Sequence, residues 1–318
     1  MRYLITGGAG FIGSHLAELC LREGHSVTAV DDLSTGRRDN IAPLLANPAF
    51  TFIHESILNE MVLDRLVSQA EVVVHLAAAV GVKMIVDDPV RGIEVNVQGT
   101  HHVLKSAGRY NTKVIVASSS EVYGKGAKIP FSEEDDILLG PSSVNRWSYA
   151  ASKMVDEFLA LGYARQYGVP AIVVRLFNTV GPRQTGAYGM VIPRLTTQAL
   201  RGEPLTVYGD GNQQRCFCDV RDVARALLGL AAEPRAVGQV FNVGGREEVS
   251  IAELATRIVA VTESASTLTY IPYTEAYNAN FEDIRRRVPN IARIEGLIGW
   301  TPQIPLDTIL KDVRDSLR

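Results

Sequence analysis

Cysteine is scarce in this chain, and its spacing matches no common structural use. Three cysteines occur among 318 residues, Cys20, Cys216 and Cys218, and none of them forms a CxxC pair. An odd count without that spacing is typical neither of a disulfide framework nor of a zinc site. The sequence therefore predicts a fold without disulfide bridges and a site without a metal ion.

The chain also lacks a large excess of one charge and a long apolar run. Its formal net charge is −3, which gives no general attraction to nucleic acid or anionic lipid. No apolar stretch reaches the roughly 18 residues of a membrane span. The first residues, 1–7, enter a strand pattern at once and leave no room for a signal peptide. We expect a cytoplasmic protein with no nucleic-acid or membrane partner.

Repeats and low-complexity segments are absent, and a hydrophobic content of 46% is enough for one large core or two joined lobes. Short β-branched runs alternate with helical patterns through the first half of the chain. The expected strands are 3–5, 26–30, 72–76, 114–117 and 171–175, and the expected helices are 15–22, 58–68, 95–109 and 148–167. This alternation predicts an α/β fold, a Rossmann-type doubly wound parallel sheet covered by helices on both faces.

The pattern loosens after residue 177 into segments rich in glycine and proline. A helix pattern near 220–232 and a strand pattern over 240–243 follow, and the remainder carries arginine and aromatic residues between short elements. We therefore predict two units. The predicted division is 1–177 with 217–244 for a dinucleotide-binding domain, and 178–216 with 245–318 for a smaller α/β substrate lobe.

A glycine-rich loop follows the first expected strand directly and opens a helix. It reads Thr6-Gly7-Gly8-Ala9-Gly10-Phe11-Ile12-Gly13, and its glycines permit a tight turn and let a pyrophosphate approach the amide groups at the helix N-terminus. Asp31 ends the second expected strand, 18 residues after Gly13. A carboxylate there accepts hydrogen bonds from ribose hydroxyls and repels a 2′-phosphate. The pattern predicts NAD rather than NADP as the cofactor.

Tyr149 and Lys153 are four residues apart on an expected helix and therefore share one face of it. At about 5 Å and an effective dielectric constant near 20, an ammonium favours a phenolate by about 3 kcal/mol, so we expect Lys153 to lower the pKa of Tyr149. Tyr149 would then serve as a base near neutral pH, more so beside an oxidised nicotinamide. The same spacing also occurs where a half-buried tyrosine lies beside a surface lysine, and the glycine loop upstream favours the redox interpretation.

A further buried-strand run, 114–117, ends in Ser118-Ser119-Ser120-Glu121, whose polar side chains can reach a ligand in the crevice of the sheet. With these features the chain resembles the extended short-chain dehydrogenase/reductase family of nucleotide-sugar epimerases, dehydratases and decarboxylases. The resemblance covers nearly the whole chain. The matching segments are TGGAGFIGSHL at 6–16, HLAA at 75–78, Asn96, SSSEVYG at 118–124, YAASK at 149–153, RLFNTVGPR at 175–183, LTVYGDGNQQR at 205–215 and LIGWTP at 297–302.

The resemblance implies a catalytic triad of Ser119, Tyr149 and Lys153, in which Tyr149 accepts the proton of a sugar 4-hydroxyl while C4 gives a hydride to NAD. It also implies that Asn178 and Arg215 contact the nucleotide diphosphate, since a guanidinium suits phosphate oxygens. The implied cofactor contacts are Gly7, Gly10, Phe11, Ile12, Gly13, Asp31, Leu76, Ala77, Ala78, Asn96, Tyr149 and Lys153. The implied substrate contacts are Lys83, Ser120, Arg146, Asn178, Arg183, Val191, Tyr208, Arg215, Arg285 and Arg287.

Residues 120 and 121 separate the reactions of the family. In the sugar 4,6-dehydratases this strand end resembles Thr-Asp-Glu, whereas here the Asp position is Ser120, which disfavours dehydration. Simple 4-epimerases usually lack a glutamate at 121. Glu121, the RWSY segment at 146–149 and DIRRRVP at 283–289 resemble the UDP-glucuronate decarboxylases. In that subgroup the arginine that matches Arg287 works beside the glutamate that matches Glu121.

Decarboxylation of UDP-glucuronate is therefore the expected reaction. Oxidation at C4 of a hexuronate gives a β-keto acid, whose carboxylate Arg287 would hold and whose enolate Glu121 and a water would reprotonate. The product would be a UDP-4-keto-pentose or, after return of the hydride, UDP-xylose. A 4-epimerase of UDP-glucose or UDP-glucuronate is the alternative, because such enzymes bind the same substrate. A protein that binds NAD without turnover is a third possibility, which the intact triad argues against.

One segment departs from the family pattern. Relatives often carry Gly-Asp-Ile after the third strand, with the aspartate contacting adenine, but this chain reads Glu55-Ser56-Ile57. We expect adenine recognition to be weaker or displaced. The resemblance also implies a UDP-linked nucleotide sugar as the substrate and a homodimer built on the helices around 95–109 and 149–167.

Overall fold

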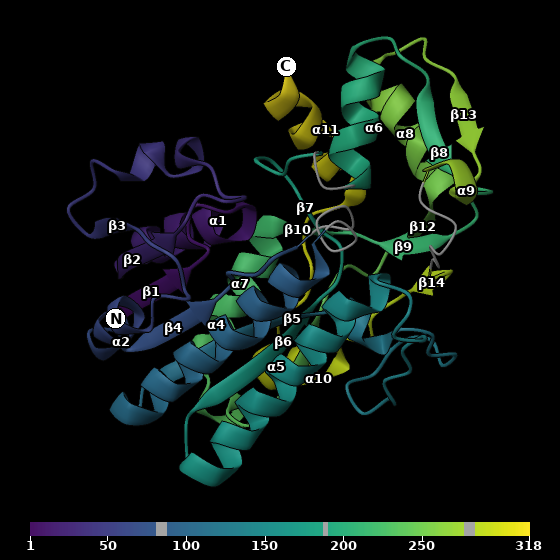
Figure 1. Ribbon diagram of the computed structural model, residues 1–318. Helices are drawn as coiled ribbons and strands as arrows, with labels where there is room; N and C mark the ends of the chain where they lie inside the picture. Colours follow the sequence, from purple (N-terminus) through teal and green to yellow (C-terminus); the bar gives the residue numbers. More distant parts are fainter. Residues whose placement is uncertain (81–87, 187–189, 277–283) are drawn as a thin grey trace.

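The computed structural model describes residues 1–80, 88–186, 190–276 and 284–318. Among these residues a parallel sheet of seven strands forms the larger unit, in the order β11-β6-β5-β4-β1-β2-β3 (Figure 1). Its strands are β1 (Arg2–Thr6), β2 (Ser26–Asp31), β3 (Phe50–His54), β4 (Val72–His75), β5 (Lys113–Ser119), β6 (Ala171–Leu176) and β11 (Val240–Val243). The predicted α/β, doubly wound fold is confirmed. The order reverses between β1 and β4, and such a switch point opens a ligand crevice at the carboxyl ends of the strands.

Helices cover both faces of this sheet, because successive side chains of each strand point to opposite faces. Tyr3 and Ile5 of β1 join one buried cluster with α1 (Phe11–Arg22) and α7 (Val220–Ala232). Leu4 points to the other side, into a cluster shared with the second layer of helices. That layer consists of α2 (Glu60–Ser68), α4 (Pro89–Tyr110) and α5 (Arg146–Tyr167).

Helix α4 begins at Pro89, six residues before the expected start at 95. The Asp88 side chain caps it by accepting from the Arg91 amide, and Pro89 occupies the first turn, where the missing N–H costs nothing. The apolar side chains of this first turn, Val90 and Ile93, are exposed, so they follow no core-facing pattern. None of the helices in the described ranges is long and apolar enough to cross a bilayer.

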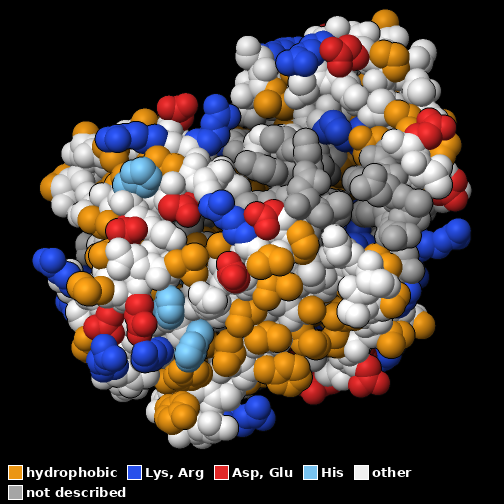
Figure 2. Space-filling model, viewed as in Figure 1, with side chains coloured by type: hydrophobic (Ala, Val, Ile, Leu, Met, Phe, Trp, Pro, Cys, Tyr) orange, Lys and Arg blue, Asp and Glu red, His pale blue; other side chains and the backbone are white. Residues whose placement is uncertain are grey.

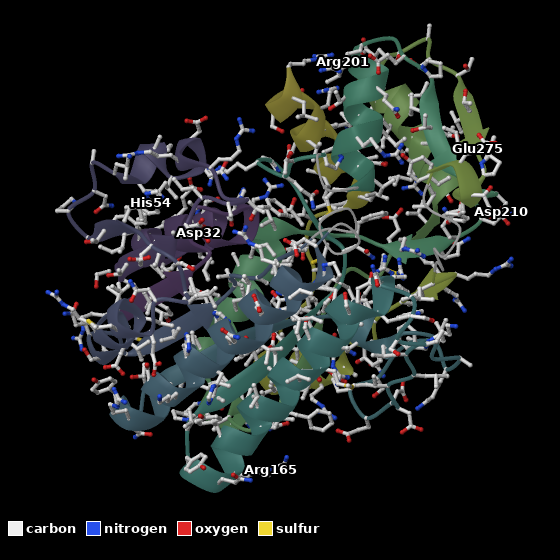
Figure 3. The ribbon with its side chains drawn as sticks, in the orientation of Figure 1. Asp32, His54, Arg165, Arg201, Asp210 and Glu275 are labelled. Carbon is white, nitrogen blue, oxygen red and sulfur yellow. The ribbon has the colours of Figure 1, made fainter. Side chains whose placement is uncertain are left out.

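The smaller unit packs three helices around its own apolar core. These helices are α6 (Val191–Leu200), α8 (Ile251–Thr262) and α11 (Leu306–Leu317). Short strands flank them: β8 (Leu205–Tyr208) pairs with β13 (Leu268–Ile271), and β9 (Gln214–Cys216) lies between β12 (Glu248–Ser250) and β14 (Arg286–Arg287). Asp32 and His54 mark the ends of β2 and β3 in the sheet, whereas Asp210 and Glu275 lie in the smaller unit (Figure 3).

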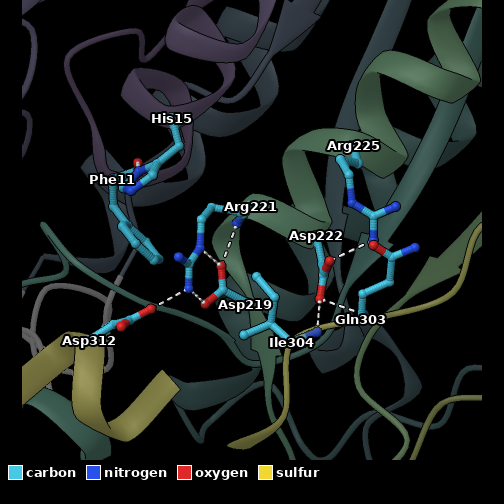
Figure 4. Close-up of polar contacts among 9 residues, drawn as sticks. All are labelled: Phe11, His15, Asp219, Arg221, Asp222, Arg225, Gln303, Ile304 and Asp312. Atoms are coloured by element: carbon cyan, nitrogen blue, oxygen red, sulfur yellow. Dashed lines mark hydrogen bonds and ion pairs between the residues drawn. The ribbon is translucent and has the colours of Figure 1, made fainter. Parts of the chain in front are cut away.

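Short elements join the two units, and ion pairs cross between them. Strand β7 (Thr179–Val180) pairs with β10 (Cys218–Asp219), just before α7. Arg221 on α7 pairs with Asp219 and reaches Asp312 on α11 over 2.5 Å (Figure 4). Arg183, in the loop after β7, pairs with Glu18 on α1. The remaining elements are α9 (Tyr273–Ala276), α10 (Ala292–Ile298) and the 3-10 turns η1 (Arg38–Asn40), η2 (Ala42–Leu44), η3 (Ser120–Tyr123) and η4 (Pro234–Ala236).

Candidate active site

A cavity of about 520 Å³ lies where the carboxyl ends of the strands face the smaller unit. Residues after β1, β2, β4, β5 and β6 line one side of it, and residues of α6, β8 and β9 line the other. This volume is in the range of small-molecule and cofactor sites. It is also the position that the reversal of strand order predicts.

The glycine loop forms the floor of one end of the cavity and needs its glycines for close packing. Gly7 has a φ of +69°, and a Cβ on Gly13 would lie 2.2 Å from the Gly7 carbonyl oxygen. Gly10 begins α1 without a side-chain cap, so no side chain competes there for the amide groups of the first turn. Gly7, Gly10, Phe11, Ile12 and Gly13 all line the cavity. The loop therefore fits the pyrophosphate of a dinucleotide.

Asp31 lies at the end of β2 on the same wall. Its Oδ2 accepts from the Ala9 amide over 3.0 Å and its Oδ1 from the Leu33 amide over 2.8 Å. These bonds fix the carboxylate beside the glycine loop, and each oxygen keeps capacity for a further bond. Burial raises the pKa of Asp31, whereas the two amides lower it. The position suits the ribose hydroxyls of NAD.

The remaining predicted cofactor contacts divide into two groups. Leu76, Ala77 and Ala78 line the cavity. Asn96 does not: its Oδ1 accepts from the Ala79 amide over 2.8 Å, and its Nδ2 donates to Ser152 Oγ over 3.0 Å. These two bonds tie the Asn96 amide to the loop after β4 and to helix α5. A direct cofactor contact for Asn96 stays a prediction.

The departure at 55–57 places a different acid in the cavity. Glu55 and Ile57 line it, next to Asp32 at the end of β2, whereas Ser56 does not. Glu55 accepts from the Ser56 amide over 2.8 Å and from Asn59 Nδ2 over 3.0 Å. A carboxylate is thus present at this wall, one position earlier in the chain than the family pattern indicates.

Ser119, Tyr149 and Lys153 all line the middle of the cavity. Ser119 ends β5, and its hydroxyl accepts from the Glu121 amide over 3.2 Å. Tyr149 and Lys153 project from the first two turns of α5. Burial raises the pKa of Tyr149 well above its ordinary value, the charge of Glu121 raises it further, and the Ser119 hydroxyl lowers it.

The expected effect of Lys153 on Tyr149 is not found in the protein alone. The Lys153 ammonium donates instead to Asp156 Oδ2 over 3.1 Å, and the two side chains are 3% and 0% exposed. The carboxylate offsets the positive charge that was expected to stabilise the phenolate. Burial first, then the charge of Glu121 and after it that of Asp156, raise the pKa of Tyr149, which corrects the prediction that it is lowered.

Glu121 lies between two arginines at the substrate side of the cavity. Its Oε1 is 2.5 Å from Arg287 Nη1 and its Oε2 is 3.1 Å from Arg146 Nη2. Burial would raise the pKa of Glu121, but Arg287, Arg146 and Arg215 outweigh it and hold the pKa below its usual range. Glu121 is therefore a carboxylate at neutral pH. Arg287 lines the cavity with a side chain that is 14% exposed, while its Nε is buried and has no hydrogen-bond partner among the described residues.

The cavity brings together most of the predicted substrate contacts, from both units. Ser120, Arg146, Asn178, Arg183, Val191, Tyr208, Arg215 and Arg287 line the cavity. Arg285 is not among the lining residues: its side chain is exposed, and its carbonyl oxygen accepts from the Gln214 amide and from Arg215 Nη1. A substrate contact of the Arg285 side chain stays a prediction. Lys83 lies outside the described residues.

The structure also adds residues that the sequence interpretation missed. Arg194 on α6 lines the cavity and lies 4.3 Å from the Tyr208 ring centroid in a cation–π contact. Gln213 lines it as well, with its Nε2 donating to Tyr208 O over 3.0 Å. Gln213 belongs to the matched segment 205–215, which was a usable signal. Arg194 belongs to no matched segment and could be found only from the fold.

The chain is similar to known proteins over its whole length. Residues 3–244 match the NAD dependent epimerase/dehydratase family. A UDP-N-acetyl-alpha-D-glucosaminuronate decarboxylase of Bacillus cytotoxicus is 44% identical over 98% of this chain and 96% of its own. UDP-glucuronic acid decarboxylase 1 of Xenopus tropicalis is 35% identical over 96% and 69%. The structure of a UDP-glucuronic acid 4-epimerase from Bacillus cereus, bound to UDP-glucuronic acid and NAD, is 28% identical over 100% and 99%, with a TM-score of 0.90.

Proposed function

Because the chain belongs to the NAD-dependent epimerase/dehydratase family, we propose that it is a UDP-hexuronate decarboxylase that oxidises C4 of the sugar with NAD. The observation that carries this proposal is the position of Glu121 between Arg287 and Arg146. A decarboxylase must hold a substrate carboxylate and protonate the carbanion left behind. A guanidinium and an ionised carboxylate that both line the cavity supply groups for the two tasks.

Bound NAD supplies a hydride acceptor for C4. Tyr149 takes the proton of the 4-hydroxyl, and Ser119 beside it can bind the developing C4 carbonyl. The 4-keto uronate is a β-keto acid, so the bond between C5 and the carboxyl carbon breaks with its electron pair moving to C5 and the C4 oxygen. Carbon dioxide leaves, and C5 takes up a proton.

Arg287 orients the substrate carboxylate through the part of its guanidinium that lines the cavity. Glu121 is held ionised, so it acts on a water that delivers the C5 proton rather than as the acid itself. The arginines on the cavity wall suit the rest of the substrate, since a nucleoside diphosphate carries charge that guanidinium groups bind well. They are Arg146, Arg183, Arg194, Arg215 and Arg287.

Identity is 44% to the relative named for the acetamido sugar and 35% to the one named for glucuronic acid. UDP-N-acetylglucosaminuronate is therefore the first substrate to test, and UDP-glucuronate the second. The enzyme, NAD and each substrate are incubated together, and carbon dioxide and sugar products are followed by NMR. Loss of one carbon with formation of a UDP-pentose or its 4-keto form is expected. A C4-inverted uronate with all its carbons would show a 4-epimerase instead.

We further propose a domain division, an oligomeric state and a compartment. The chain divides into one unit of residues 1–177 with 217–244 and a second of residues 178–216 with 245–318. The chain forms a homodimer, which exposed apolar side chains on α4 and α5 support: Val90, Ile93, Val155 and Phe158. The enzyme works in the cytoplasm, where nucleotide sugars are made.

A further inference from the structure

Lys153 and Asp156 form an ion pair that is sealed from water, with side chains 3% and 0% exposed. A buried ion pair usually adds little stability compared with apolar residues of the same size, because both charges must leave water. Stability alone therefore does not account for a carboxylate at this position. The YxxxK spacing does not require one either.

Polar groups connect Asp156 to the loop after β4. The Thr100 hydroxyl faces Asp156 and, with Lys153, opposes the rise in pKa that burial causes. His75 Nε2 lies 3.0 Å from Thr100 Oγ1, and His75 Nδ1 lies 2.7 Å from Thr6 Oγ1. Thr6 Oγ1 in turn accepts from the Ala77 amide over 3.2 Å.

The charge state of His75 decides how the hydrogen bonds in this series of polar groups can run. Burial and the charge of Lys153 lower the pKa of His75 to about 3, so the ring is neutral, with one donor and one acceptor nitrogen. One of the Thr100 and Thr6 hydroxyls therefore donates to the ring and the other accepts from it. The series begins at Ala77, a residue of the cavity wall, and ends beside Asp156, whose Oδ1 is buried and has no hydrogen-bond partner among the described residues.

Charged groups face Tyr149 and the buried pair from two elements. On α5, Asp156 acts on Tyr149 and Glu157 acts on Asp156, and from η3 Glu121 acts on Tyr149. From β4 the neutral His75 faces the pair, and from α4 the uncharged Thr100 does so. Asp156 therefore offsets the charge of Lys153 and opposes loss of the phenolic proton.

We propose that Asp156 is a positioning residue that aims the Lys153 ammonium at Tyr149 and the bound cofactor, and limits how strongly that ammonium promotes loss of the phenolic proton. Tyr149 then stays protonated in the free protein. With Lys153 balanced by Asp156, the positive nicotinamide is the unbalanced charge that favours proton removal. This inference rests on the proposed C4 oxidation.

The test is Asp156→Asn, with kcat and KM for carbon dioxide release measured against pH and the dissociation constant for NAD measured by calorimetry. Removal of the negative charge lowers the pKa of Tyr149, so the acidic limb of the kcat profile moves to lower pH. We expect kcat at the optimum to fall about tenfold and NAD to bind about tenfold more weakly, the effect of one poorly placed charge-assisted hydrogen bond. The substrate KM stays within about twofold. In Asp156→Glu, which keeps the charge, the acidic limb of the kcat profile returns to its wild-type pH.

Asp222→Asn is the matched control. Asp222 is also a buried carboxylate, 1% exposed, paired with Arg225 and accepting from the Gln303 and Ile304 amides (Figure 4). It does not line the cavity, so its loss lowers the melting temperature without moving the pH profile. Asp156→Ser replaces Asp156→Asn if the latter does not fold.

A profile of the Asp156 variant that superimposes on the wild-type profile, or an unchanged affinity for NAD, overturns the inference. Failure of the wild-type protein to turn over any UDP-hexuronate would instead contradict the proposed function. The two failures are therefore distinguishable.

Discussion

Arg287 Nη1 lies 2.5 Å from Glu121 Oε1, although 166 residues separate them in the chain. Glu121 begins the turn after β5 of the large sheet, and Arg287 ends β14 of the smaller unit. The contact therefore joins the two units across the cavity. It also holds Glu121 as a carboxylate next to an arginine that lines the cavity.

Glu121→Gln should lower the rate of carbon dioxide release by about a hundredfold or more, a usual effect of losing a general acid–base group. Glutamine keeps the size of the side chain but cannot activate a water as a carboxylate does. The measurement is kcat by NMR or a coupled carbon dioxide assay. NAD affinity serves as the control, since Glu121 lies with the substrate contacts, and a variant with wild-type kcat would contradict a role in protonation.

Arg287→Ala should weaken binding of a UDP-hexuronate by about thirtyfold, because a charge-assisted hydrogen bond to the carboxylate is lost. UDP alone should bind within about twofold of wild type. Arg285→Ala is the matched variant, two positions away with an exposed side chain outside the cavity. Isothermal titration calorimetry with UDP and with the UDP-hexuronate measures the affinity of both variants. An equal loss of affinity for the two ligands in Arg287→Ala would mean that Arg287 contacts the diphosphate rather than the carboxylate.

The Glu121 pair should also make stability depend on pH. The pKa of Glu121 is lower in the folded protein than in the unfolded chain, so its contribution is present above the unfolded pKa and is lost as pH falls through the folded value. The free energy of unfolding of wild type should therefore decrease more on acidification than that of Glu121→Gln. Urea unfolding at a series of acidic pH values measures the difference, and parallel curves would be the contrary result.

Asp31→Ser should reduce the preference for NAD over NADP by about tenfold or more, since the carboxylate that repels a 2′-phosphate is removed. Some stability is lost as well, because the Ala9 and Leu33 amides lose their acceptor. Dissociation constants for both cofactors give the ratio. Asp32→Ser, at the adjacent cavity position, is the control and should leave that ratio largely intact.

Phe158→Asp should convert a dimer to a monomer. Phe158 is 63% exposed on α5, and Figure 2 shows apolar side chains gathered over the long helices α4 and α5. A charge there would have to be buried in the interface without a partner. Sedimentation velocity gives the mass. Met61→Asp, at a residue 83% exposed on α2, is the matched control and should keep the wild-type mass.

The fold was predictable because its signals are local. Helix α7 and strand β11 have the predicted bounds, 220–232 and 240–243, since their apolar patterns are strong and their ends are well marked. The start of α4 was misplaced because its first turn is capped and exposed rather than buried. The site residues on the glycine loop and on α5 were found for the same local reason: three-residue spacing and an i, i+4 pair fix geometry within one element.

The sequence by itself determined the cofactor loop, the acid at the end of β2 and the pairing of Tyr149 with Lys153 on one helix. Only the tertiary structure decided which charges meet across elements. It placed Arg287 against Glu121, tied the Asn96 amide to Ala79 and Ser152, and gave Lys153 a buried partner in Asp156. The physical reason is burial: the packing of α4 and β4 against α5 excludes water, and a charge without water must take the nearest opposite charge.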